Sequence, residues 1–234
     1  MAEKTLKGIK FPGLDDYYLI PQFYEAKIAV YVNNAIYGAI DGNIESISND
    51  KVTYVRDYGY YQHQFLKAVQ FPIATRIGHY SFYMCPELTA IDIPNTEIVG
   101  DFAFKGCPKI QTIDFPNATA IGTGCFDECA ALSSINLPKV TSVKELSFRE
   151  CSSLNNVVLP SVNLIWDQAF WGCSNLSSIT LSANEVCTLK NVNAFDFTPI
   201  AEGTGYIYVP SNLVNTYKST SNWSNYANQI RAIN

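Results

Sequence analysis

The sequence lacks the features that would connect it to nucleic acid or to the interior of a membrane. Its 16 Lys and Arg are outnumbered by 21 Asp and Glu, and the net charge of −5 leaves no basic excess for a phosphate backbone. No run approaches the roughly 18 to 20 apolar residues that a spanning helix needs. Even residues 28–40 are interrupted by Asn33, Asn34 and Gly38. We therefore expect neither a nucleic-acid partner nor insertion into a membrane.

Other scarcities argue against catalysis. Only two histidines, His63 and His79, are available for a Ser-His-Asp or Cys-His arrangement, and His79 has no acid at a telling offset. Neither of the glycine motifs that cradle phosphates occurs. Asp41, Asn43 and Glu45 do not match the offsets of a calcium-binding loop. The sequence thus predicts no enzyme activity, catalytic residue, cofactor or metal ion.

What the sequence does contain is an internal repeat, shown by its cysteines. Five of the seven follow one another at steps of 22 residues: Cys85, Cys107, Cys129, Cys151 and Cys173. The repeated unit is Ile/Val-Gly, a Phe, a Cys three residues later, a Leu three residues after that, and then Ile-x-Leu-Pro. Clear copies begin at Ile77, Val99, Ile121, Val143 and Ile165. A worn copy begins at Val55, with Tyr60 for Phe and His63 for Cys.

Each unit is expected to form one short parallel strand. In the first clear copy, alternation sends Ile91 and Ile93 inward and Ala90 and Asp92 outward, and Pro94 ends the strand. Units of 20 to 29 residues with this Leu-x-x-Ile-x-Leu segment are typical of leucine-rich repeats. Residues 55–186 are therefore predicted to be a leucine-rich repeat solenoid, with one strand per 22-residue coil.

The return path of each coil carries the Phe and the Cys. Phe82, Cys85 and Leu88 lie three residues apart, which predicts a short helical turn or an irregular segment. The cysteine column leaves three interpretations open: metal ligands, disulfides between coils, or small buried side chains. Stacked thiols can neither surround an ion nor easily reach disulfide geometry, which favours burial. Cys125 and Cys187 lie off the column and are the best candidates for exposure, although burial is expected for them too.

The repeat resembles the BspA-like class of bacterial leucine-rich repeats, on the pattern Ile-Gly-x-x-x-Phe-x-x-Cys-x-x-Leu-x-x-Ile-x-Leu-Pro. The ending from Val209 through Tyr217 and Trp223 to Tyr226 resembles the closing segment common after such repeats. Separately, residues 7–18, KGIKFPGLDDYY, are similar to the N-termini of tail-associated structural proteins of phages and prophages.

Both ends of the solenoid are expected to be capped, because exposed apolar coils would pair with another chain. Residues 1–54 are predicted to be a β-rich capping or attachment segment, with a hairpin turn at Asp41-Gly42. Residues 187–234 are predicted to hold an irregular segment, a last strand at Ile207 and Val209, and a helix that Ser211 or Asn212 caps. Helical spacing joins Leu213, Val214, Tyr217, Trp223, Tyr226 and Ile230.

Two surfaces are candidates for ligand binding. The outward strand positions present small polar groups, among them Thr112, Ser134 and Asn136, although they fit a solvated sheet as well. On the return path, Trp166 and Trp171 are predicted to form an exposed aromatic pair, and Tyr83 occupies the position of Trp171 in an earlier coil. The alternative is that the two tryptophans pack against residues 187–205.

These observations predict a non-enzymatic binding or structural module. The resemblances imply a phage or prophage tail-associated or cell-surface protein that recognises a protein or a cell-surface glycan. The start of the chain carries charges without the apolar run of a signal peptide. We therefore expect synthesis in the cytoplasm and a virion-associated or extracellular destination. The alternative is a secreted bacterial adhesin whose leader is missing from this sequence. The sequence does not define an oligomeric state.

Overall fold

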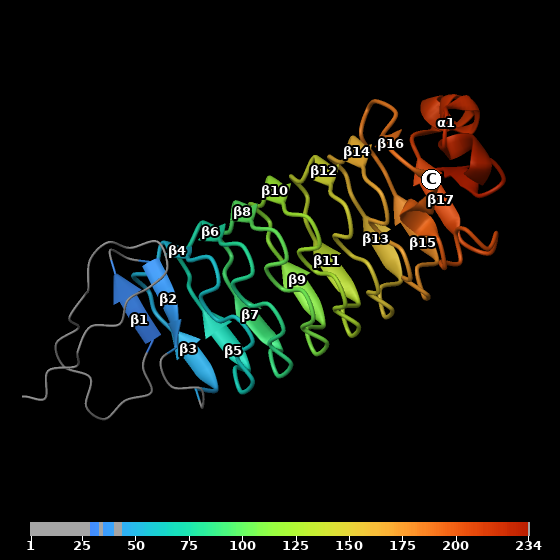
Figure 1. Cartoon of the computed structure of the whole chain (residues 1–234). Coiled ribbons are helices and arrows are strands. Elements are labelled where there is room, and N and C mark those ends of the chain that lie inside the picture. The colour runs from blue at the N-terminus through green and yellow to red at the C-terminus, as the bar shows by residue number, and fades with distance from the viewer. Residues whose placement is uncertain (1–28, 33–34, 40–43, 234) are drawn as a thin grey trace, which may run out of the picture.

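The computed structural model describes residues 29–32, 35–39 and 44–233, with side chains from residue 44 onward. They form an elongated slab of coils that lie side by side from the blue N-terminal end to the red C-terminal end (Figure 1). Residues 7–18, on which the expectation of a tail-associated protein rested, lie outside the described residues. Within the described part of the chain, no helix is long and apolar enough to cross a membrane.

One face of the slab carries the predicted strands. They pair in parallel, and Ile47, Val69 and Ile91 are aligned at steps of 22 residues. Three hydrogen-bonded groups run β3-β5-β7, β9-β11 and β13-β15-β17-β18. The strands are β3 (Ser46–Ser48), β5 (Ala68–Gln70), β7 (Ala90–Asp92), β9 (Thr112–Asp114), β11 (Ser134–Asn136), β13 (Asn156–Val158), β15 (Ser178–Thr180), β17 (Tyr206–Val209) and β18 (Ile230–Ala232). The parallel solenoid with a 22-residue coil is thus confirmed.

A second strand in each coil, which the sequence pattern did not predict, forms another parallel ladder. Its members are β4 (Tyr54–Val55), β6 (Arg76–Ile77), β8 (Ile98–Val99), β10 (Ala120–Ile121), β12 (Ser142–Val143), β14 (Leu164–Ile165) and β16 (Thr188–Leu189). Gly78 and Gly100 directly follow two of these strands. A Cβ on either would lie 2.5 Å from the backbone of the preceding coil. Glycine therefore lets neighbouring coils approach closely enough to pair here.

Of the two forms predicted for the return path, the described coils have the irregular segment and not the helical turn. Residues 80–88 form turns in which Tyr80 and Met84 adopt φ values of 54° and 53°. The equivalent positions of the other coils are also left-handed, which an α-helix excludes. Hydrogen bonds run between coils instead, as from Phe82 N to the Ala103 carbonyl at 2.7 Å. The three-residue spacing reflects this repeated turn geometry.

A ladder of aromatic rings runs through the core. Neighbouring rings are stacked with centroids 5.1 to 5.6 Å apart, and Tyr60 occupies the phenylalanine position as predicted. All members are buried: Tyr60, Phe82, Phe104, Phe126, Phe148, Phe170 and Phe195. Aliphatic side chains of the strands surround this ladder, so each coil buries its inner side chains against those of its neighbours.

The cysteine column is hydrogen-bonded to this ladder. Each thiol donates to the carbonyl of the aromatic residue 25 positions earlier, as from Cys129 Sγ to the Phe104 oxygen at 3.2 Å. All seven cysteines are free and buried, which confirms the burial expected for the column and for Cys125 and Cys187. Cys125 belongs to a column of small buried residues that includes Ala103 and Ala169.

The N-terminal end differs from the predicted hairpin. Residues 41–43 lie outside the described residues, but β2 (Ala35–Ala39) and β3 on either side belong to different sheets. The antiparallel partner of β2 is β1 (Ala29–Val32), and its other neighbour is β4 in parallel. Parallel pairing therefore begins before residue 55. Ile47 takes an inward position one period before Val69, and this draws β3 into the ladder instead of into a hairpin.

The C-terminal end holds the predicted strand β17 but only a short helix. The helix α1 covers Val214–Ser219, between the 3₁₀ turns η2 (Ser211–Leu213) and η3 (Trp223–Tyr226), while η1 (Val192–Phe195) lies earlier. No side chain caps η2 or α1, so the predicted cap is wrong. Ile230 lies in β18 and not on the helix, because α1 ends at Ser219 with Thr220 extended, and Asn222, with φ of 66°, separates α1 from η3.

Candidate functional site

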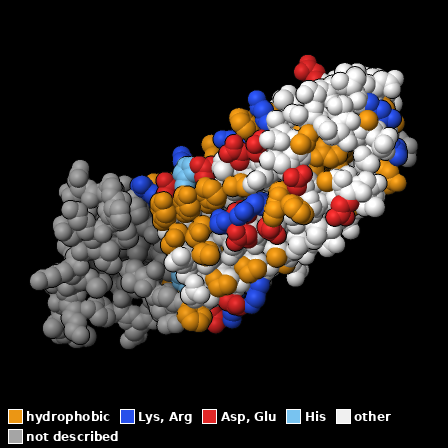
Figure 2. All heavy atoms as spheres, turned by 45° about the vertical axis from the view of Figure 1, so that its right-hand side comes forward, with side chains coloured by type: hydrophobic (Ala, Val, Ile, Leu, Met, Phe, Trp, Pro, Cys, Tyr) orange, Lys and Arg blue, Asp and Glu red, His pale blue; other side chains and the backbone are white. Residues whose placement is uncertain are grey.

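Aromatic and charged side chains gather along the edge of the slab that the return turns form, which we call the turn edge. Hydrophobic side chains gather beside the grey atoms in Figure 2, with basic and acidic side chains next to them. In chain order the turn edge comprises Tyr58, Tyr61, Tyr80, Tyr83, Phe102, Lys105, Asp127, Glu128, Arg149, Glu150, Trp171 and Phe197. It divides into an aromatic part and a charged part.

The aromatic part, the tyrosine cluster, contains Tyr58, Tyr61, Tyr80, Tyr83 and Phe102. Tyr58 stacks on Tyr80 with centroids 5.1 Å apart, and Tyr61 stacks on Tyr83 at 5.0 Å. Phe102 extends the first stack at 5.2 Å. Tilted contacts of 5.7 and 5.6 Å join the two stacks. Despite these contacts, Tyr58 is 58% and Tyr61 43% exposed.

This packing makes the tyrosine cluster a rigid surface. The stacked faces cover one another, so a partner would meet mainly ring edges and phenol groups. Partial burial, and then the nearby Tyr58, raise the pKa of Tyr80 above its usual value of 10.0. The hydroxyl therefore stays protonated at neutral pH and remains a hydrogen-bond donor. Large, rigid side chains with a polar end are typical of protein interfaces, since little side-chain entropy is lost on binding.

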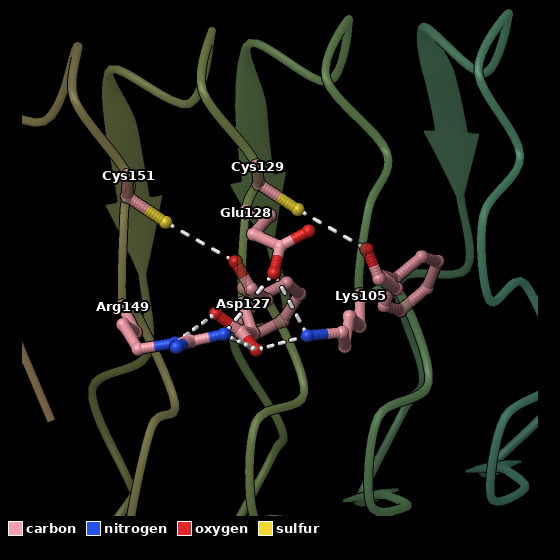
Figure 3. Close-up of polar contacts among 8 residues, drawn as sticks. Lys105, Asp127, Glu128, Cys129, Arg149 and Cys151 are labelled. Carbon is pink, nitrogen blue, oxygen red and sulfur yellow. Dashed lines mark hydrogen bonds and ion pairs between the residues drawn. The ribbon is translucent and has the colours of Figure 1, made fainter. Parts of the chain in front are cut away.

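The charged part centres on Asp127, whose carboxylate is fully buried. Lys105 Nζ lies 2.6 Å from Asp127 Oδ2, and Arg149 Nε lies 2.8 Å from Asp127 Oδ1. Glu128 joins the cluster through Oε1, at 2.9 Å from Lys105 and 3.1 Å from Arg149. Figure 3 shows the two cations on either side of the two carboxylates. Lys105 belongs to the preceding coil and Arg149 to the following coil. Two positive and two negative charges thus balance across three coils.

The pKa directions of the two cations fit this arrangement. Burial lowers the pKa of Lys105, but the hydrogen bonds to Asp127 and Glu128 together outweigh it and hold the pKa above 10.5. For Arg149 the hydrogen bond to Asp127 is the main cause of a raised pKa. Both cations stay charged at neutral pH, so the cluster is a paired structural unit that joins three coils.

Removing the buried charge should therefore cost stability. Asp127→Asn keeps the shape but leaves Lys105 and Arg149 to share Glu128, and we expect a loss of about 2 to 3 kcal/mol in the free energy of unfolding by urea. Glu87→Gln is the matched control, because the exposed pair Lys109–Glu87 also joins adjacent coils, at 2.6 Å. It should cost less than about 1 kcal/mol. Equal losses for the two variants would contradict a structural role for Asp127.

The residues predicted as candidate ligand contacts are divided between two surfaces. Tyr83 and Trp171 lie on the turn edge, and Trp171 packs edge-to-face on Phe197 with centroids 4.8 Å apart. Trp166 lies on the strand side of the same coil, where its Nε1 donates to Ser142 Oγ at 3.2 Å. No ring contact joins Trp166 to Trp171 within the described part of the chain, so the predicted pair does not form. Each instead contacts a residue of the segment 187–205. Trp171 contacts Phe197, and Lys190 Nζ lies 5.1 Å from the centre of the Trp166 ring.

Thr112, Ser134 and Asn136 lie on the face of the longer strands. Their side chains are exposed, and Ser134 is aligned with Thr112. Asn136 Nδ2 donates to Asp114 Oδ1 at 2.7 Å, and Gln70 and Asp92 form a similar pair at 2.8 Å. Because part of this row is paired along the sheet, it offers a ligand fewer free polar groups than its sequence suggests.

A contact of His79 with the next coil was missed in the sequence. Asp101 occupies the same position in that coil, and its backbone N–H donates to His79 Nδ1 at 2.9 Å. Because Nδ1 accepts this bond, it donates none to Asp101 Oδ2, which lies 3.3 Å away. Residues that are 22 positions apart in the sequence come into contact only when the coils are stacked. The same offset joins Tyr58, Tyr80 and Phe102, so the repeat period could have identified the tyrosine cluster.

Comparison with known proteins agrees with this architecture. The model of a family described as BspA type leucine-rich repeat region, in 6 copies, matches residues 33–97 and 75–202. No curated protein matches the chain. A leucine-rich repeat protein of T. pallidum has a TM-score of 0.59 and 24% identity, over 64% of this chain and 77% of that one. It shows the shared fold.

Two further structures are similar at lower scores. One is a leucine-rich cell surface protein of Faecalibacterium prausnitzii, with a TM-score of 0.49 and 21% identity over 77% of this chain. The chain spans 55% of that protein. The other is the pneumococcal vaccine antigen PcpA, with a TM-score of 0.45 and 14% identity, over 82% of this chain and 68% of that one.

Proposed function

Because the chain belongs to the BspA-type leucine-rich repeat family, we propose that it is a non-enzymatic binding module whose turn edge contacts a protein partner. Repeat solenoids act through the surface that their coils present. The tyrosine cluster carries the proposal, since five aromatic side chains are held in fixed contact at an accessible edge.

The chemistry of the tyrosine cluster favours a protein over a glycan. Sugar rings stack on open aromatic faces, whereas the rings here are stacked on each other. Ring edges and phenol groups suit the mixed apolar and polar contacts of a protein hot spot. Met84, which follows Tyr83 in the chain and is 41% exposed, adds apolar area beside the cluster.

Two biological roles are consistent with this proposed module. The phage-like residues 7–18 favour a tail-associated protein that contacts a host cell. The alternative is a bacterial surface adhesin. Both use the same turn edge and differ in the source of the partner, so detection of the protein in purified virions or in a cell-surface fraction would distinguish them.

Binding should depend on the tyrosine cluster. The partner is first identified by cross-linking the biotinylated chain to bacterial cells and is then purified. We expect the double variant Tyr61→Ala/Tyr83→Ala to bind this surface protein at least about 100-fold more weakly than the parent. Ser134→Ala/Asn136→Ala is the matched control on the other face and should bind within about threefold of the parent. Trp171→Ala tests whether contact extends along the turn edge. Circular dichroism of each variant checks folding, and equal binding by both folded double variants would contradict the proposal.

A further inference from the structure

The face of the longer strands changes character at its C-terminal end. Along the preceding coils the outward positions hold small side chains, ending with Ser178 and Thr180 on β15. The residues aligned with these two on β17 are Tyr206 and Tyr208. The centroids of their rings lie 6.3 Å apart, and the two planes are tilted by 48°.

Arg231 on β18 completes this corner. It is aligned with Tyr208, and its guanidinium carbon lies 5.0 Å from the centre of the Tyr206 ring. Nη1 donates to the carbonyls of Asn228 and Ile230 at 2.7 and 3.0 Å. The guanidinium is therefore held in place by the backbone and by a cation–π contact, and its Nε and Nη2 donors form no hydrogen bond to the described residues.

The positive charge of Arg231 also has no acidic partner within 4.0 Å among the described residues, unlike Lys105 and Arg149. Tyr206, Tyr208, Arg231 and Ala232 line an open hollow of about 340 Å³. It combines two aromatic surfaces with a fixed cation that still has a two-donor fork.

We propose that this hollow binds a sugar ring that carries a carboxylate, such as a uronic acid. The guanidinium fork matches a carboxylate in two parallel hydrogen bonds, and the C–H face of the pyranose packs on the tyrosine rings. A neutral sugar lacks the ionic contact, and a simple carboxylate lacks the ring contact. The site lies on the strand face, away from the turn edge, and extends the proposed protein-binding function to a second ligand.

Titration of the isotope-labelled full chain, followed by NMR, tests the site. D-glucuronate should shift the signals of Tyr206, Tyr208 and Arg231 with a Kd in the millimolar range, as expected for one sugar ring with few contacts. D-glucose and acetate should each bind at least about 10-fold more weakly. Arg231→Gln should weaken glucuronate binding by at least about 10-fold, and Tyr206→Ala should also weaken it.

Lys190→Gln is the matched control. Lys190 also lies over an aromatic ring, at 5.1 Å from that of Trp166, so the variant removes one charge and one cation–π contact elsewhere. It should leave glucuronate binding unchanged. The proposal is overturned by the absence of shifts at about 50 mM glucuronate, by equal binding of acetate, or by equal losses in Arg231→Gln and Lys190→Gln. None of these outcomes bears on the tyrosine cluster, which is tested with other residues and another ligand.

Discussion

Raising the pH from 8 to 10 should remove much of the stability of this protein. Burial raises the pKa of six thiols above the ordinary value of 9.0, to about 12 for Cys129, Cys173 and Cys187. The other three are Cys107, Cys125 and Cys151. An unfolded chain releases these protons near pH 9, whereas the folded chain retains them. The stabilising contribution is therefore complete below pH 9 and is lost as the pH rises above it.

The expected effect is large because the thiols act together. At pH 10, above the ordinary thiol pKa, each thiol favours the unfolded chain by about 1 kcal/mol, and the six together contribute several kcal/mol. A domain of this kind has a total stability of about 5 to 15 kcal/mol. Urea denaturation followed by circular dichroism at pH 8, 9 and 10, with reductant present, should show this decline.

Cys125→Ala gives a matched control for the thiol contribution. Ala103 and Ala169 occupy the same column in other coils, so alanine fits the position. The variant should lose about 1 kcal/mol less than the parent between pH 8 and pH 10. A total loss below about 2 kcal/mol in the parent would show that the thiols ionise without unfolding, against their burial.

Phe126→Ala should destabilise the protein by about 3 to 5 kcal/mol. The Phe126 ring is fully buried and lies between those of Phe104 and Phe148, with centroids at 5.6 and 5.4 Å. Neighbouring coils cannot close the resulting cavity, because hydrogen bonds hold them on each side, such as that from Cys151 Sγ to the Phe126 carbonyl at 3.2 Å. The free energy of unfolding in urea measures the loss.

The matched control is the same substitution at an exposed ring of the solenoid. Phe197 is 64% exposed and packs on Trp171 only from one side. Phe197→Ala should therefore cost less than about 1 kcal/mol. A loss below about 0.5 kcal/mol for Phe126→Ala would mean that the inward and outward sides of the return path are wrongly assigned.

The repeat period and the inward columns were readable from the sequence. Every coil must bury one slice against the next, so the same side-chain sizes return every 22 residues, and Phe126, Cys129 and Leu132 could be recognised as core. Outward positions such as Ser134 followed from the two-residue alternation of a strand. These features could be predicted from the sequence alone, since residue type and spacing indicate which side chains are buried.

Only the tertiary structure decided what lies between the coils. The second strand pairs where the backbones of neighbouring coils lie close together, as at Gly78, and the left-handed residues Tyr80 and Met84 are held by hydrogen bonds between coils. Asp127 reads as a surface residue until the stacked coils place Lys105 and Arg149 on either side of it. Such contacts join residues 21 or 22 positions apart, and a local sequence pattern does not show that these residues are close until the coils are stacked.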